Sequence, residues 1–84
     1  MTLPTLPPIH PGEILREEFL VPLGMSAADL AIRLGVPAAD VEQIAAERAP
    51  ITDDMAMRLG KHFRTSAEVW IGMQRSYDVK TSAR

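Results

Sequence analysis

Apolar residues recur at intervals of three and four positions along most of this chain, and no stretch alternates between apolar and polar residues as a half-buried strand would. A proline, a glycine or a capping residue interrupts the pattern wherever one apolar stripe gives way to the next. The pattern therefore predicts an all-α fold, a compact bundle of five short helices without a β-sheet.

Local signals indicate where these helices begin. Ser26, Thr52 and Ser66 stand before apolar stripes at N-cap positions, where a hydroxyl oxygen accepts from a free backbone amide. Pro11 and Pro37 suit the first turn of a helix, because the amide that proline lacks is unpaired there in any case. These five residues predict the starts of all five helices.

Other signals indicate where the ordered domain ends. The first helix is expected to stop at about Leu20, because residues 21–24 (Val-Pro-Leu-Gly) follow, and the second is expected to stop at Gly35. Prolines are dense in residues 1–10, which predicts an extended or disordered tail. The domain is then residues 11–80, and the polar residues 81–84 are expected to fray.

The segment 30–44 is the most informative part of the chain. Two short helices that cross steeply after a tight turn need a small residue where their backbones meet, and Ala31 stands there. Gly35 tolerates the positive φ that such a turn requires. The angle between the helices is filled by apolar residues, which are Leu30, Leu34, Val36, Val41 and Ile44. The spacing favours a helix-turn-helix, although two ordinary packed helices of a structural bundle would use the same residues.

In a helix-turn-helix the second helix enters the major groove of DNA and its outward residues face the base edges. Gln43 is suited to adenine, and Glu42 could accept from the amino group of cytosine. Arg48, Lys61 and Arg64 could lie against phosphates, with a solvated surface position as the alternative for each. The candidate DNA-binding residues are Ala38, Ala39, Glu42, Gln43, Arg48 and Thr52.

Composition and charge narrow the class of protein. A chain of 84 residues suffices for one domain of modest stability, so dimerisation or a partner is expected to add to it. The chain has no cysteine, no membrane-length apolar run and no signal peptide, which predicts a soluble cytoplasmic protein. The net charge of -2 argues against binding nucleic acid by bulk electrostatics. Because residues 11–49 carry seven acids and three bases, and residues 50–84 four acids and six bases, a phosphate-facing surface should draw on the second half.

Catalytic and metal chemistry find little support in the sequence. His10 and His62 are the only histidines, and neither forms a metal-ligand pair with a neighbour on one helical face, so both are expected to be capping or surface groups. Ser26 and Ser66 are assigned to helix caps rather than to a nucleophile. We predict no enzyme activity, no metal and no cofactor.

Beyond these physical signals, the chain resembles the HigA-like antitoxins, also called VapI-like, of the XRE group of phage-repressor-like regulators. The resemblance runs from about Ile9 to Asp78. It rests on the helix-turn-helix and on several further motifs in the right order, which are residues 10–15 (HPGEIL), 18–20 (EFL), 22–26 (PLGMS), 51–52 (IT), 66–70 (SAEVW), Gln74 and 77–78 (YD). It implies a lambda-repressor-like DNA-binding domain that forms a homodimer, binds a palindromic operator and represses its own operon. It also implies a tight complex with a HigB-like, RelE-type toxin that cleaves messenger RNA.

The chain departs from the family pattern on its expected DNA-binding side. Ala27 replaces a glutamine that follows the capping serine in relatives, and the exposed positions of the recognition helix are small or acidic rather than Arg and Asn. The following loop, residues 46–50, lacks the usual glycine C-cap, so the third helix is expected to run on. These departures predict weak or unusual operator binding.

Two further surfaces are candidates for protein contacts. Trp70, Met73 and Tyr77 form a stripe on the last predicted helix, and such large side chains serve either core packing or a dimer interface, to which we assign them. The acidic residues Glu13, Glu17 and Glu18 are the candidate toxin-binding residues, because they could meet a basic toxin surface. The proline-bearing segment 2–9 is either inert or engages a partner as an extended strand.

The leading hypothesis is thus an antitoxin that neutralises a toxin and regulates its own operon. Two alternatives remain. One is a protein-interaction module of the same fold whose DNA binding is lost or weak, which the acidic recognition helix favours. The other is a stand-alone XRE-type repressor, which would share every sequence feature above.

Overall fold

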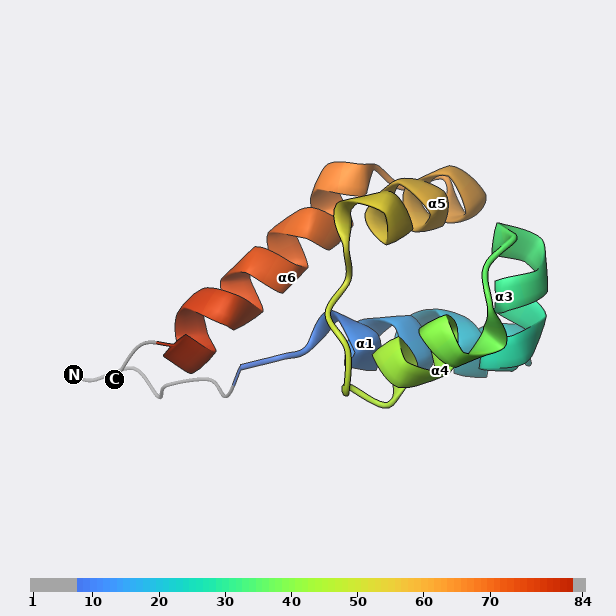
Figure 1. Cartoon of the computed structure of the whole chain (residues 1–84), viewed down its shortest axis with the longest axis horizontal. Coiled ribbons are helices and arrows are strands. Elements are labelled where there is room, and N and C mark those ends of the chain that lie inside the picture. The colour runs from blue at the N-terminus through green and yellow to red at the C-terminus, as the bar shows by residue number, and fades with distance from the viewer. Residues whose placement is uncertain (1–7, 83–84) are drawn as a thin grey trace.

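The computed structural model describes residues 8–82, and over this range it contains helices and no strand. α1 (Pro11–Ile14), η1 (Leu15–Leu20) and α2 (Val21–Leu23) follow one another without a break and form one helical run. The remaining helices are α3 (Ala27–Leu34), α4 (Ala38–Ala45), α5 (Asp53–Phe63) and α6 (Ala67–Ser82). The predicted all-α bundle of five helices is confirmed for these residues, with the run 11–23 as its first member (Figure 1).

The helix starts follow from local capping, as predicted. The hydroxyls of Ser26, Thr52 and Ser66 each accept from the backbone amide three residues on, at 3.0, 3.2 and 3.2 Å. His10 caps the first run, because its Nδ1 accepts from the amide of Gly12 at 2.9 Å. The predicted capping role of His10 is therefore confirmed.

The first run continues three residues beyond its predicted end at Leu20. Its central part, η1, is π-helical, and the amide of Val21 donates to the carbonyl of Arg16 five residues back. A proline inside an α-helix clashes with the carbonyl four residues earlier, and the wider π turn leaves room for Pro22. Gly24, with φ of 61°, then ends the run in the left-handed conformation.

The C-terminal end also differs from the prediction. α6 extends to Ser82, so residues 81 and 82 are helical rather than frayed. The hydroxyls of Thr81 and Ser82 donate to the backbone carbonyls of Tyr77 and Asp78, four residues back, at 2.9 and 2.7 Å. The predicted tail is described only from residue 8, where residues 8–10 are not helical. Residues 1–7 and 83–84 lie outside the described range.

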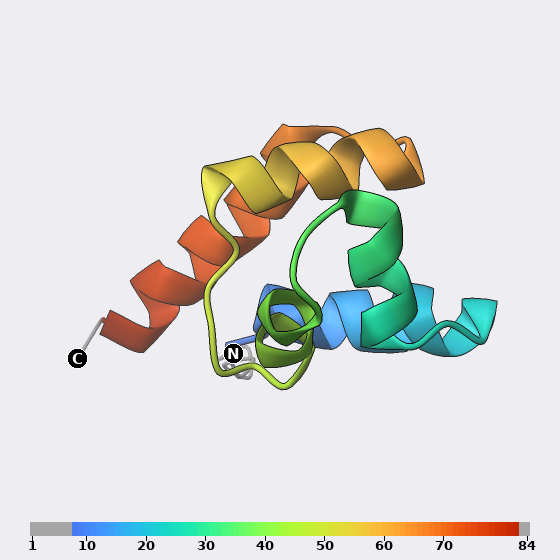
Figure 2. The ribbon, with the colours of Figure 1, turned by 45° about the vertical axis from the view of Figure 1, so that its right-hand side comes forward.

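The core lies between the first run, α3 and α4 on one side and α5 and α6 on the other, as Figure 2 shows. Leu15, Leu30, Leu59 and Trp70 are fully buried at its centre. The first run also packs closely on α4, since a Cβ at Gly12 would overlap the carbonyl oxygen of Ile44. Among residues 8–82 no helix combines the length and apolar character that crossing a membrane requires.

Candidate nucleic-acid interface

The turn between α3 and α4 has the geometry that the sequence predicted. Gly35 caps α3 with φ of 73°, in the left-handed region that favours glycine. The amide of Val36 donates to the carbonyl of Ala31 at 3.0 Å, and Ala31 is buried at the junction. The chain then turns back, and α4 lies beside α3 at a steep angle to it (Figure 2). The predicted helix-turn-helix is therefore present, and residues 30–44 are not one continuous helix.

The outward face of α4 carries four of the six predicted DNA-binding residues. Ala38, Ala39, Glu42 and Gln43 are exposed, whereas Val41, Ile44 and Ala45 face the core. This division follows from helical spacing, because the apolar positions recur at three- and four-residue intervals. The exposed amide of Gln43 is free to meet a base edge.

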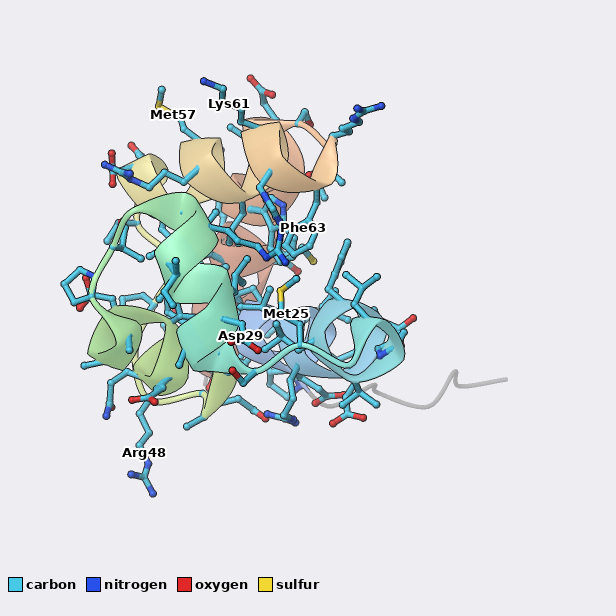
Figure 3. The ribbon with its side chains drawn as sticks, turned by 90° about the vertical axis from the view of Figure 1, so that its right-hand side faces the viewer. Met25, Asp29, Arg48, Met57, Lys61 and Phe63 are labelled. Carbon is cyan, nitrogen blue, oxygen red and sulfur yellow. The ribbon has the colours of Figure 1, made fainter. Side chains whose placement is uncertain are left out.

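A hollow lies beside this face, between α4, the loop that follows it and the start of α5. It is lined by Ala39, Asp40, Gln43, Ile44, Ala49, Pro50, Thr52 and Met55. The structure thus brings together Ala39 and Gln43 from α4 with Thr52 from the N-terminus of α5. Arg48 is not part of the hollow; it is exposed on the loop after α4 and points away from the body of the molecule in Figure 3.

An arginine that the sequence analysis missed holds the end of α4. Arg16 donates from Nη1 to the carbonyl of Ala45, from Nε to Glu17 at 2.9 Å and from Nη2 to Glu47 at 3.1 Å. The hydrogen bonds to Glu17 and then Glu47 raise the pKa of the Arg16 guanidinium above its ordinary value. Arg16 therefore ties the first helical run to the C-terminus of the recognition helix.

The same contact explains why α4 stops where it does. Glu47 takes the left-handed conformation, with φ of 63°, in place of the missing glycine, and α4 ends at Ala45. The expectation that the third helix would run on is therefore wrong. A non-glycine residue at positive φ is strained, and the pairing of its carboxylate with Arg16 offsets part of that strain.

Two more side chains reach backbone groups near the site. Gln74 of α6 is buried and accepts from the amide of Ile51 at 2.7 Å, which fixes the extended segment ahead of Thr52. Arg58 of α5 donates from Nη1 to the carbonyl of Leu34 at 2.7 Å and so holds the end of α3. The sequence contained Gln74 as part of a motif but gave no signal for either contact.

The predicted dimer residues fall into two groups. Trp70 is fully buried within its own chain, where its Nε1 donates to Thr65 Oγ1 at 3.0 Å and its ring lies 5.4 Å from that of Phe19. The assignment of Trp70 to a dimer interface is therefore wrong, because it has no surface left for a partner. Met73 and Tyr77 are half-buried, and the rings of Tyr77 and His10 form a T-shaped pair with their centroids 4.8 Å apart.

The predicted toxin-binding acids lie on the first helical run. Glu17 and Glu18 are exposed and Glu13 is half-buried. Glu17 is already paired with Arg16. Glu18 forms no ion pair within residues 8–82, so its carboxylate is available to a partner.

Comparison with known proteins places this architecture in a family. No family model matches the chain. It is 48% identical over 75 residues to virulence-associated protein I of Dichelobacter nodosus, covering 89% of this chain and 69% of the relative. The solved structure of the Pseudomonas aeruginosa antitoxin HigA with the higBA promoter is 49% identical, with a TM-score of 0.88 over 89% of this chain and 82% of that one.

The chain belongs to the HigA-like antitoxin family of helix-turn-helix regulators. The antitoxin GraA in complex with its operator supports the same assignment, at 44% identity and a TM-score of 0.87 over 98% of this chain and 83% of that one. The resemblance drawn from the sequence motifs is therefore confirmed. α4 is the second helix of the helix-turn-helix and so has the position of a recognition helix.

Proposed function

We propose that this chain is the antitoxin of a type II toxin–antitoxin pair, which neutralises a HigB/RelE-like toxin and represses its own operon by binding operator DNA. The observation that carries the proposal is the outward face of α4, with Gln43 exposed after a glycine-capped turn. The two solved relatives named with their promoter or operator DNA support it, because they share this fold at 44% identity or more.

In this proposal α4 enters the major groove and reads a few base pairs. The amide of Gln43 donates to and accepts from the edge of adenine, and the methyl groups of Ala38 and Ala39 contact thymine methyls. Glu42 accepts from the amino group of cytosine. These base contacts are few, so each half-site contributes modest affinity for DNA. The sequence specificity then depends strongly on Gln43.

Phosphate contacts come from the segments on either side of the hollow. Thr52 stands at the N-terminus of α5, where free amides and the helix dipole favour an anion. Arg48 projects from the loop after α4 and reaches a phosphate as a flexible cation. A homodimer through the exposed parts of Met73 and Tyr77 would set two recognition helices about 34–36 Å apart on successive major grooves.

In this proposal the toxin is bound at the first helical run. Glu17 and Glu18 are exposed on the first helical run, and carboxylates there complement the basic surface expected of a protein that binds RNA.

Substitution of Gln43 with alanine tests the role of α4. We expect operator affinity to fall by about 1–3 kcal/mol, because one bidentate base contact is lost. The measurement is fluorescence anisotropy with the promoter region of its own gene at two salt concentrations, with Glu68→Gln, an exposed change on α6, as the control. Unchanged affinity of the Gln43→Ala protein would remove Gln43 from the base-reading role.

The acidic charge on the outward face of α4 favours a second candidate function. Asp40 and Glu42 are exposed on α4, and no Lys or Arg lies within residues 37–45, which suits a protein-interaction module better than a tight DNA binder. Wild-type protein that fails to shift its promoter DNA at low salt, yet copurifies with the product of the neighbouring gene, would favour this module over the autoregulating antitoxin.

A further inference from the structure

A basic groove lies between the C-terminal parts of α3 and α5. Its lining residues are Arg33, Leu34, Arg58, Lys61, His62 and Arg64. Four of the nine Lys and Arg residues of a chain with net charge -2 thus surround one hollow, and no carboxylate lines it. The rest of the chain carries five Lys and Arg against eleven Asp and Glu, so this concentration of cations is a distinct feature.

Most of these cations have no acidic partner in the part of the chain that the structure describes. Of the ion pairs formed within residues 8–82, only Arg58 with Asp54, at 2.8 Å, includes a residue of the groove. Arg58 also donates to the carbonyl of Leu34, so its position is fixed by α3 and α5 together. Arg33, Lys61 and Arg64 are exposed, and their charges face the solvent.

Helix stability accounts for only part of this arrangement. Cations in the last turn favour a helix, and Arg33 in α3 and Lys61 in α5 have that position. Arg64 adds a third charge in a conformation that disfavours it, because it caps α5 with φ of 59°, where glycine is the usual residue. A strained residue that also carries a charge into a groove is a candidate for binding rather than for folding.

The groove is separate from the surface proposed for DNA. Thr52 and Arg64 stand at opposite ends of α5, about 18 Å apart along the helix axis at 1.5 Å per residue. In Figure 3, Lys61 and Arg48 lie at opposite ends of the molecule. A ligand in the groove therefore leaves α4 and the loop after it accessible.

We propose that this groove binds a short acidic peptide segment of a partner protein. Charge complementarity calls for an anion, and two exposed apolar side chains just outside the lining of the groove favour a peptide that extends past the cations over a phosphate. Ile32 is 80% exposed and precedes Arg33 in α3, and Met57 is 63% exposed one turn before Lys61 on the outer side of α5 in Figure 3, so both lie at the margin of the groove rather than in its lining. Such residues contact peptide side chains and offer nothing to a phosphate backbone.

The size of the groove limits the length of the segment. From Arg58 to Arg64 the helix advances about 9 Å, which matches two to three residues of an extended peptide. The segment would carry carboxylates toward Lys61 and Arg64 and an apolar residue toward Met57. This site is independent of the proposed role of α4, and it can be tested whether or not the chain binds an operator.

The test is fluorescence anisotropy with a labelled peptide of about twelve residues in which Asp and Glu alternate with Leu, at about 50 mM salt, where screening is weak. The groove variant Lys61→Glu/Arg64→Glu is compared with the charge-matched Arg75→Glu/Lys80→Glu on α6, whose residues are exposed outside the groove. We expect the groove variant to bind about tenfold more weakly than wild type and the control to stay within about twofold. A peptide with Asn and Gln in place of the acids should not bind.

Three further measurements decide what occupies the groove: peptide binding by an Arg64→Gly variant, competition with duplex DNA, and self-association. Arg64→Gly removes one groove cation and relieves the left-handed strain, so it preserves folding and should weaken peptide binding even if the double variant does not fold. Equal losses in both charge variants, or no loss in the groove variant, would overturn the proposal. So would displacement of the peptide by duplex DNA together with lower DNA affinity of the groove variant, since the groove would then be a phosphate surface. Salt-sensitive self-association that is lost in the groove variant would instead identify a second copy as the occupant and would equally overturn it.

Discussion

Two glycines of this chain occupy opposite environments, and the difference shows what single residues do for the fold. Gly12 is buried where the first helical run meets α4, and a Cβ there would overlap the carbonyl oxygen of Ile44. Gly72 is exposed in α6, and a Cβ there would meet open space. The first glycine allows the recognition helix to be held close, whereas the second only loosens its own helix.

Alanine at these two positions should change stability in opposite directions. Gly12→Ala should lower the free energy of unfolding by about 1–3 kcal/mol, because the added methyl forces the two backbones apart. Gly72→Ala should raise it by about 0.5–1 kcal/mol through helix propensity. Urea unfolding followed by circular dichroism measures both changes. A Gly12→Ala protein as stable as wild type would contradict the tight packing of the first run on α4.

A charged residue stands in the left-handed conformation, where glycine is usual, after two of the helices, α4 and α5. Glu47 and Arg64 both have positive φ, at 63° and 59°. The side chain of Glu47 is paired with Arg16, whereas Arg64 has no carboxylate partner within residues 8–82. The strain at Glu47 is thus partly offset inside the molecule, and the strain at Arg64 is not.

Glycine at the two helix ends should therefore give unequal gains. Arg64→Gly should raise the free energy of unfolding by about 1 kcal/mol, since an L residue in the left-handed region costs about that much. Glu47→Gly should raise it by less, because the ion pair with Arg16 is lost at the same time. Thermal unfolding of the two variants, with Arg75→Gly in the middle of α6 as a destabilising reference, tests the order. A larger gain in the free energy of unfolding at position 47 than at position 64 would show that the ion pair with Arg16 does not offset the strain at Glu47.

The molecule as a whole presents separate surfaces on a small core. The proposed DNA surface lies on α4, the basic groove lies at the far end of α5, and α6 leaves Val69 and Met73 on one side, four residues apart. A domain of this size buries a limited fraction of its apolar surface, so a second copy on α6 would add to its stability.

A charge on that side of α6 should separate the proposed dimer. Ser76 is exposed and follows Met73 by three residues, so Ser76→Glu places a carboxylate beside the apolar side chains without entering the core. We expect sedimentation equilibrium to show a dimer for the wild type and a monomer for Ser76→Glu, while Arg75→Glu, on another side of the helix, stays dimeric. A wild type that sediments as a monomer at all concentrations would remove α6 as a dimer interface.

Features that depend on neighbours in the chain could be predicted, and features that depend on distant partners could not. Capping by Ser26 and the turn at Gly35 follow from contacts within four residues, so their sequence signals are sufficient. Arg16 reaches Ala45 across 29 positions, and the backbone contacts of Arg58 and Gln74 span 24 and 23. No local pattern specifies such pairs, because they form only when packing brings their helices together.

Hydrophobic spacing, capping residues and turn glycines were enough to define the helices, the helix-turn-helix and the exposed side of α4. The free energy that favours each of these features comes from contacts between residues close in the sequence, so short stretches of the chain are enough to specify them. Packing alone decided that Trp70 belongs to the core, that Glu47 ends α4 through Arg16, and that cations from α3 and α5 share one groove. The physical reason is that burial and charge clustering belong to surfaces made by several helices at once, and these surfaces exist only in the folded molecule.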